Sequence, residues 1–317
     1  MLAYDKIIID TSNIFYRVAS FYLKDLDQSK VNQLLKSNII LSTYKSFILN
    51  MKQSTLGKVI LLFDPLSSEK KGNSRSQIDE NYKENRKNLK IQDILKYEIL
   101  SRLYKLFVTE NYGVDIYHDL EYEADDFAEK LTEKEKCLLI TSDKDFSRYL
   151  EEGRVDMLTQ GLTIKDDSIF TSNNFKEKYG FIPNISSVTL WKVCYGDTSD
   201  NIVGAFTSKS TKVLRQASEE MQKILVYEGE QNRDLTLVKK ELFQGLGIYK
   251  QLNYLLSLSN TDCSLKKLFD MIDNNLQLIE SKLPRNSDID VNKFLVKPLF
   301  NKEKVIKKSF TLNSRKF

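Results

Sequence analysis

The sequence contains one histidine, His118, among its 317 residues. Ser-His and Cys-His nucleophilic triads and His-rich zinc sites all need imidazole groups, so this scarcity excludes those classes of site. The three cysteines, Cys137, Cys194 and Cys263, are widely separated and form neither a disulfide framework nor a zinc-knuckle pattern. Chemistry in this protein must therefore depend on carboxylates, lysines and arginines.

Long apolar runs are also missing. No run approaches the roughly 18 residues that a membrane-spanning helix needs, and the N-terminal stretch MLAYDKIIID lacks the basic-then-apolar pattern of a signal peptide. The composition, 41% hydrophobic and 29% charged, is that of a globular protein, and only four prolines interrupt the chain. These features predict a globular cytoplasmic protein with no membrane segment.

Positive charge is concentrated near the C-terminal end. The whole chain carries +4, but residues 291–317 contain eight Lys and Arg residues and one acid, a local balance of +7. The preceding residues therefore carry −3, the difference between +4 and +7. Two interpretations of this basic tail stay open: a solvated segment, or a segment that contacts phosphate groups directly.

Four short apolar runs, separated by helix-like segments, predict an α/β fold with a parallel sheet and helical crossovers. Asp10, Asp64 and Asp143 lie at or just beyond the ends of three of them. The carboxyl ends of parallel strands meet at one edge of a sheet, so acids that are distant in sequence should converge there. The four runs are KIIID (6–10), KVILLFD (58–64), VDIYH (114–118) and KCLLIT (136–141).

The remaining segments differ in character. Residues 66–104 begin with a polar, charged stretch, and apolar spacing of three and four returns from Ile91, which predicts a helix that packs on the sheet. After Asn184 strand patterns nearly vanish, which predicts a helical region. Its expected core residues are Trp191, Phe243, Leu255, Leu268 and Phe269. The predicted division is an α/β domain (1–185), a helical region (186–290) and the basic tail (291–317).

Nine acids are expected around the same edge of the sheet. A single Asp at a strand end is usually a helix N-cap or a loop residue, but so many carboxylates together are costly unless cations neutralise them. Without histidine or cysteine partners the expected cation is hard and prefers oxygen, as Mg²⁺ and Mn²⁺ do. The acids are Asp10, Asp64, Glu123, Asp125, Asp126, Asp143, Asp145, Asp197 and Asp200.

Two such ions together would suit the hydrolysis of a phosphodiester. They would bridge the phosphate, lower the pKa of a bound water and stabilise the leaving oxygen. A metal-free pair of carboxylates acting as general acid and base needs only two acids and leaves most of the set unused. The acids therefore favour metal-dependent hydrolysis of a polyanionic substrate.

Six motifs occur in the order IIIDTSNIFYR, LLFDP, NYKENRK, YEADDFAEKL, LITSDKDF and YGDTSDNIVG. Together they resemble the flap endonuclease and 5′-to-3′ exonuclease family, most closely its bacteriophage members and the 5′-nuclease domain of bacterial DNA polymerase I. The resemblance covers residues 5 to about 215. It implies a PIN-like parallel sheet flanked by helices, a helical arch at about 66–104 and a C-terminal helical DNA-binding region. It also implies the host cytoplasm if the protein is viral.

The resemblance assigns the acids to two ions. The first ion would be held by the acids Asp10, Asp64, Glu123 and Asp125, some of them through water. The second would be held by Asp143, Asp145, Asp197 and Asp200, and Asp126 matches a supporting acid. Every carboxylate of the family has a counterpart here, which implies an active enzyme with two Mg²⁺ ions, for which Mn²⁺ may substitute.

The arch segment supplies the implied catalytic cations. Lys83 and Arg86 match the basic residues that hold the scissile phosphate and stabilise charge in the transition state. Tyr82 lies where an aromatic ring can stack on a terminal base, and Lys87 is a further candidate for nucleic-acid contact. By composition alone these residues would form a solvated helix face.

The match weakens after GDTSDN. The family continues with a glycine-rich hairpin that grips the duplex and often a K⁺ ion, whereas IVGAFTSKSTKVLRQ offers only Gly204. This weakens the expectation of K⁺ without removing duplex binding, for which Ser208, Lys209 and Lys212 are the candidates.

The implied function is that of a monomeric Mg²⁺-dependent 5′ nuclease acting on flaps, nicks or 5′ ends of DNA, or on RNA–DNA hybrids. Such an enzyme would remove RNA primers or flaps in replication or repair, and the tail could dock on a single-strand binding protein or a clamp. Two alternatives stay open: a Toprim- or PIN-type nuclease acting on RNA, and a non-catalytic junction-binding protein of the same fold.

Overall fold

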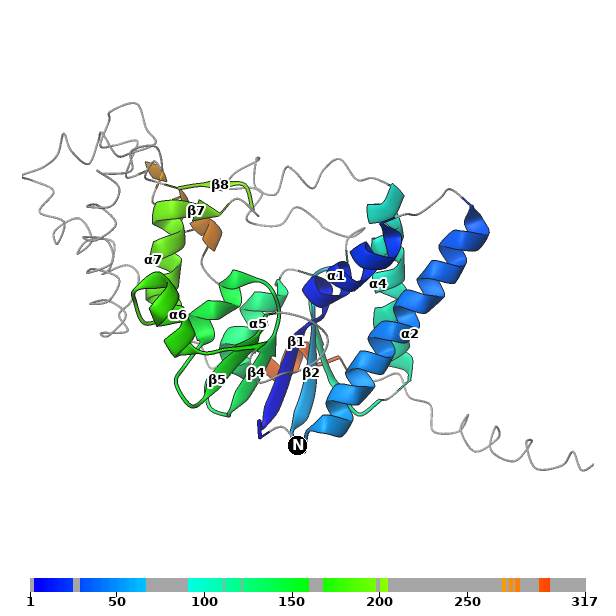
Figure 1. The fold of residues 1–317 in the computed structure, drawn as a ribbon, viewed down its shortest axis with the longest axis horizontal. Coiled ribbons are helices and arrows are strands. Elements are labelled where there is room, and N and C mark those ends of the chain that lie inside the picture. Colours follow the sequence, from blue (N-terminus) through cyan, green and yellow to red (C-terminus); the bar gives the residue numbers. More distant parts are fainter. Residues whose placement is uncertain are drawn as a thin grey trace, which may run out of the picture.

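The computed structural model describes most of the first two hundred residues and short pieces near the C-terminal end (Figure 1). The described residues are 3–24, 29–66, 91–110, 112–120, 122–159, 168–197, 200–204, 270–271, 274–275, 277–279 and 291–296. No helix within these ranges is long and apolar enough to cross a membrane.

One six-stranded sheet forms the centre of the described part, in the order β3-β2-β1-β4-β5-β6. Strands β1 to β5 pair in parallel, and β6 is antiparallel to β5. The strands are β1 (Lys6–Asp10), β2 (Lys58–Phe63), β3 (Asp115–His118), β4 (Cys137–Ile140), β5 (Val155–Leu158) and β6 (Ile169–Phe170). The four predicted strands are confirmed, and β5 and β6 are additional.

Helices cover both faces of the sheet, which explains why its strands are apolar on both sides. Alternate residues of β1 enter different cores: Ile7 and Ile9 pack in one, and Ile8 packs in the other. The first core is closed by α1 (Thr11–Leu23), α2 (Lys30–Ser54) and α4 (Ile91–Thr109). The second is closed by α5 (Ala124–Leu131), the 3-10 helix η2 (Lys144–Tyr149), α6 (Ser172–Tyr179) and α7 (Ile185–Tyr195).

The helix expected from Ile91 is present as α4. Its residues Ile99, Leu103 and Phe107 are buried in the core between the sheet and α1. The second half of the segment compared with an arch is therefore a core helix. The preceding residues, 67–90, lie outside the described residues.

The described residues that follow Asn184 most closely include two short strands besides the expected helix. Helix α7 is followed directly by the antiparallel pair β7 (Gly196–Asp197) and β8 (Ile202–Val203). Gly196 adopts φ of 80°, which favours glycine, and Asn201 in the connecting turn has φ of 61°. Trp191 packs against the second core as expected, whereas the other four predicted core residues of this region lie outside the described residues.

The first residues of the predicted basic tail pack on the α/β unit. The Val296 amide donates to the Ile116 carbonyl (2.8 Å), and Phe294, in the 3-10 helix η4 (Val291–Phe294), stacks edge-on against Tyr122. Further upstream, the Asn275 side chain donates to the carbonyls of Val193 (3.2 Å) and Val203 (2.8 Å). Chain from beyond residue 270 thus supports the second core.

We expect Leu139→Ala, at the centre of β4, to lower the free energy of unfolding by about 2–5 kcal/mol, because the cavity would form in a close-packed core. Leu139 is 0% exposed, whereas Leu56 is 88% exposed and provides the matched control. Chemical denaturation should show almost no change for Leu56→Ala, and similar losses for both variants would contradict the two-sided burial of β4.

Candidate metal centre

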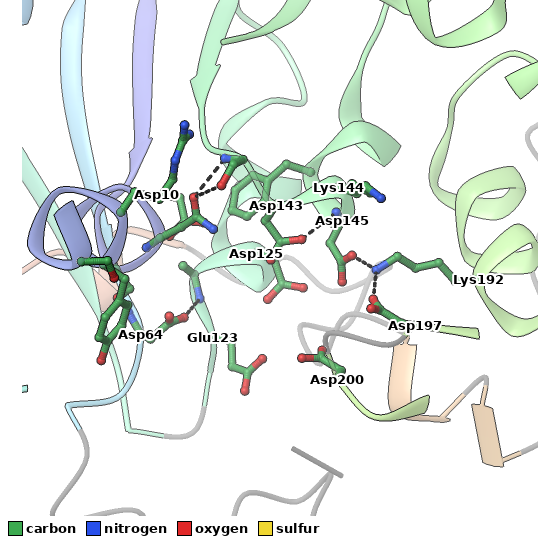
Figure 2. Close-up of a pocket in the computed structure, with 18 of the residues that line it drawn as sticks. Asp10, Asp64, Glu123, Asp125, Asp143, Lys144, Asp145, Lys192, Asp197 and Asp200 are labelled. Atoms are coloured by element: carbon green, nitrogen blue, oxygen red, sulfur yellow. Dashed lines mark hydrogen bonds and ion pairs between the residues drawn. The ribbon is translucent and has the colours of Figure 1, made fainter. Parts of the chain in front are cut away.

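The acids predicted at the edge of the sheet meet in one open pocket of about 920 Å³ at the carboxyl ends of β1, β2 and β4 (Figure 2). They come from positions almost two hundred residues apart, so the sheet topology brings them together. Eight of the nine predicted acids line the pocket, namely Asp10, Asp64, Glu123, Asp125, Asp143, Asp145, Asp197 and Asp200.

Asp10 ends β1 and begins α1, so it combines a structural role with its place in the pocket. Its carboxylate accepts hydrogen bonds from the Asn13 amide (3.1 Å) and the Thr141 hydroxyl (2.9 Å). Burial raises the pKa of Asp10 well above its usual value, and repulsion from Asp64 and Asp143 raises it further. A nearby cation would relieve both effects.

Asp64 follows β2 and fixes the start of α5. Its carboxylate accepts a hydrogen bond from the Ala124 amide (3.0 Å), and its own amide donates to the Ser12 hydroxyl (3.1 Å). Glu123 immediately precedes α5, and Figure 2 shows its side chain beside Asp64 and Asp125 in the pocket. The N-terminus of α5 thus delivers two carboxylates to the same space.

Asp126 does not line the pocket with the other acids, so the structure gives it a supporting position while its expected role as a metal residue stays a prediction. It is 0% exposed and is not among the described residues that line the pocket. Its carboxylate accepts from the Glu123 amide (2.9 Å), while its own amide donates to the Glu123 carbonyl (3.1 Å). Asp126 therefore caps α5 and positions Glu123, because residues one apart on a helix face different directions.

Asp143 and Asp145 are placed by the 3-10 helix that follows β4. Asp143 caps η2 by accepting a hydrogen bond from the Asp145 amide (3.0 Å), and the Asp143 amide donates to the Thr141 hydroxyl (3.0 Å). Burial raises the pKa of Asp143, while the ammonium of Lys192 opposes that shift. Thr141, which the sequence did not single out, links Asp143 to Asp10 through one hydroxyl.

The β7–β8 pair brings the last two acids to the pocket. One carboxylate oxygen each from Asp145, Asp197 and Asp200 lie within 4.8 Å of one another. The turn between the two strands returns Asp200 toward Asp197, which is why acids three apart in sequence share this side (Figure 2). This oxygen-only cluster has the donor set that suits a hard divalent cation.

Two buried basic residues stand against the acids and were not predicted. Lys192 contacts the carboxylates of Asp145 and Asp197 (2.6 Å to Asp197 Oδ2), and Arg148 contacts Asp125 (3.6 Å) and Asp145 (3.3 Å). Arg148 also donates to the Ile279 carbonyl (3.1 Å). The available sequence signals were the spacing of Arg148 from Asp145 and the position of Lys192 five residues before Asp197.

The remaining predicted residues lie outside the described residues. The arch candidates Tyr82, Lys83, Arg86 and Lys87 and the hairpin candidates Ser208, Lys209 and Lys212 belong to this group. Gly204, at the start of the predicted duplex-binding hairpin, is described and follows β8.

Carboxylates that converge at the carboxyl edge of a parallel sheet are the arrangement of a candidate divalent-metal centre. Residues 5–180, more than half of this chain, match the family described as "5'-3' exonuclease, N-terminal resolvase-like domain". The chain belongs to this family, which confirms the resemblance drawn from the six motifs. Among curated proteins, none matches the sequence.

Solved structures extend the likeness over most of the chain. The bacteriophage T5 flap endonuclease, in a pseudo-enzyme–product complex with DNA and metal ions, is 17% identical with a TM-score of 0.51, over 86% of this chain and 98% of that chain. Human GEN1 in complex with Holliday junction DNA is 13% identical with a TM-score of 0.46, over 88% of this chain and 61% of that chain. The likeness to the T5 protein shows a shared fold, and the predicted α/β fold is confirmed.

Asp10→Asn should stabilise the metal-free protein at neutral pH, because the buried charge whose cost raises the pKa of Asp10 is no longer present. The amide keeps the hydrogen bond from Asn13 and removes the repulsion from Asp64 and Asp143. Thermal unfolding in chelator measures this difference.

The pH dependence has a defined sign. Because folding raises the pKa of Asp10 above 3.8, the folded protein binds the proton more readily than the unfolded chain. The wild type should therefore gain stability relative to Asp10→Asn as pH falls from neutral through the raised pKa toward 3.8. A gap between the two proteins that does not change with pH would contradict the buried, repelled carboxylate.

Proposed function

We propose that the protein is a divalent-metal-dependent, structure-specific 5′ nuclease that hydrolyses phosphodiester bonds. The observation that supports this most directly is the single pocket lined by eight carboxylates, in a chain of the 5′-3′ exonuclease family. A protein that only binds polyanions gains nothing from such an acidic pocket, because the pocket repels phosphate unless cations fill it. The acids therefore favour catalysis over simple binding.

We assign two ions with oxygen ligands to this pocket; among the described residues, Asp145, Asp197 and Asp200 form the group whose carboxylate oxygens lie within 4.8 Å of one another. All donors are carboxylates, and the raised pKa values of Asp10 and Asp143 show how costly their charge is without a counter-ion. Mg²⁺ is the proposed metal and Mn²⁺ a substitute, because both prefer oxygen ligands. One ion would be held from Asp10, Asp64, Glu123 and Asp125, and the other from Asp143, Asp145, Asp197 and Asp200.

Ions held by these carboxylates would lower the pKa of a bound water molecule and would offset charge on the scissile phosphate and leaving oxygen. The protein contributes fixed ligand positions, because Thr141 ties Asp10 to Asp143 and Ala124 ties Asp64 to α5. Pre-fixed carboxylates avoid reorganisation during the reaction. Cleavage by this route leaves a 5′-phosphate and a 3′-hydroxyl.

The rim of the pocket offers groups that suit nucleic acid. Arg17 and Lys144 line it beside the acids, and the rings of Tyr16 and Tyr97 meet edge to face with their centroids 5.8 Å apart. Cations can receive phosphates next to the metal ligands, and aromatic rings can stack on bases. These groups fit a nucleic-acid substrate, and the family match favours DNA with 5′ flaps, nicks or free 5′ ends.

We further propose a role in replication or repair, in which the enzyme removes flaps or RNA primers as a monomer in the cytoplasm. The family assignment and the DNA held by the T5 relative support this role. Docking of the basic tail on a single-strand binding protein or a clamp would bring the enzyme to its substrates. In the arch segment, the cations Lys83 and Arg86 would hold the scissile phosphate.

Asp143→Asn should reduce cleavage of a 5′-labelled flap by about a thousandfold or more, the scale of losing a main electrostatic group at a reaction centre. An amide at this position keeps the hydrogen bond from the Asp145 amide, so η2 should stay capped. Binding of the flap in Ca²⁺ should remain close to that of the wild type.

The matched control is Asp115→Asn, which removes an acid from the opposite end of the sheet at the start of β3. Its cleavage rate should equal that of the wild type. Product ladders on a flap, a nicked duplex, an RNA–DNA hybrid and unstructured RNA, with Mg²⁺ and then chelator, identify the substrate. Retained cutting by Asp143→Asn, a preference for unstructured RNA, or no cutting with Mg²⁺ or Mn²⁺ would each contradict the proposal.

A further inference from the structure

Lys192 occupies an unusual position for a lysine because its ammonium lies inside the acid pocket. The residue is 3% exposed, and Nζ contacts carboxylate oxygens of both Asp145 and Asp197. Figure 2 shows the ammonium between these two carboxylates, with Asp200 on the same side of the pocket. Two of the three acids of the oxygen-only cluster thus already hold a cation that belongs to the protein.

The backbone fixes the ammonium in this place. Lys192 is in the last turn of α7, and its carbonyl accepts the amide of Gly196, where the helix ends. Gly196 then turns the chain at φ of 80°, so that Asp197 returns toward the Lys192 side chain. The neighbouring Val193 is buried in the protein, which holds this turn of α7 against the core.

A lysine is expensive to bury unless it is paired, and three carboxylates this close repel one another. The contact of Lys192 with Asp145 and Asp197 reduces both costs together. A divalent ion that uses the same oxygens must displace the ammonium or share the oxygens with it. In either case the lysine loses part of its contact with the carboxylates, and this loss reduces the net free energy of binding of the ion.

We propose that Lys192 is a tethered cation that competes with the second divalent ion for Asp145 and Asp197. This inference rests on the metal-binding part of the proposed function. It adds that the two ions bind with different affinities. Asp10, in the first set of ligands, accepts from the neutral donors Asn13 and Thr141, so an ion bound there displaces no ammonium from Asp10. Arg148 contacts Asp125 of the first set at 3.6 Å, a longer contact than that of the Lys192 ammonium with Asp197 (2.6 Å), so we take the ion at Asp145 and Asp197 as the weaker one.

Because Arg148 also contacts Asp145, the charge of Lys192 can be removed without changing the position of the Asp145 side chain. Arg148 contacts Asp145 through Oδ2, whereas Lys192 contacts Oδ1 of the same carboxylate. Arg148 also donates to the Asp145 carbonyl (2.8 Å), so it holds Asp145 in place when the lysine charge is removed. Removing the ammonium should therefore free one oxygen without releasing the side chain.

The test is calorimetric titration of the full chain with Mn²⁺, without nucleic acid. In Lys192→Met the weaker binding event should tighten at least tenfold, and the stronger event should stay within about twofold of the wild type. Lys192→Gln, which also removes the charge but stays polar, should behave in the same way. Lys192→Arg, which keeps the charge, should leave both events close to those of the wild type.

The matched control is Lys144→Met, which removes the same charge from an exposed lysine that also lines the pocket. It should change either event less than threefold, because solvent screens an exposed charge. The Mn²⁺-induced rise in Tm gives a second readout, and it should be larger in Lys192→Met than in the wild type.

Four results would overturn the inference. If the weaker event weakens in Lys192→Met and Lys192→Gln, the ammonium positions the carboxylates for the ion. If Lys144→Met tightens the weaker binding event as much as Lys192→Met does, the effect comes from the net charge near the pocket and not from the contact of Lys192. Two Mn²⁺ events that are unchanged by both Lys192 variants remove the competition but leave the proposed nuclease intact, whereas a wild type that binds no Mn²⁺ overturns both.

Discussion

Repulsion among carboxylates is the constraint around which this protein is arranged. The parallel sheet ends its strands at one edge, and that topology forces acids from distant positions into the same pocket. The raised pKa values of Asp10 and Asp143 register the electrostatic cost. Neutral donors such as Thr141 and buried cations such as Arg148 reduce this electrostatic cost. A divalent ion bound in the proposed centre would relieve the same repulsion.

Several acids serve the backbone and the pocket at once. Asp10 caps α1, Asp143 caps η2, and Asp64 accepts the first amide of α5. The ordinary interpretation of an Asp at a strand end, as a helix cap, is therefore correct for two of these residues and does not exclude a metal role. One carboxylate oxygen can accept from the backbone while the other faces the pocket. Because one side chain has both roles, the position of each ligand depends on intact local structure.

The sequence predicted the four central strands, the helix from Ile91 and the convergence of the acids, because these follow from apolar runs and strand direction. It missed β5, whose four residues VDML form no distinct apolar run. It also placed Asp126 with the acids that line the pocket, because spacing in EADD does not reveal which carboxylate turns back to cap the helix. Lys192 and Arg148 escaped notice because their partners are defined only once α7 and η2 pack together.

The hydrogen bond from Arg148 to the Ile279 carbonyl has a consequence for the order of synthesis. A guanidinium buried beneath the acids receives one of its acceptors from a residue 131 positions later in the chain. Once residue 200 has been translated, all eight carboxylates of the pocket are part of the chain, but Arg148 lacks this acceptor until residue 279 follows. This contact of Arg148 can therefore form only after residue 279 has been translated, later than the last of the pocket carboxylates, Asp200.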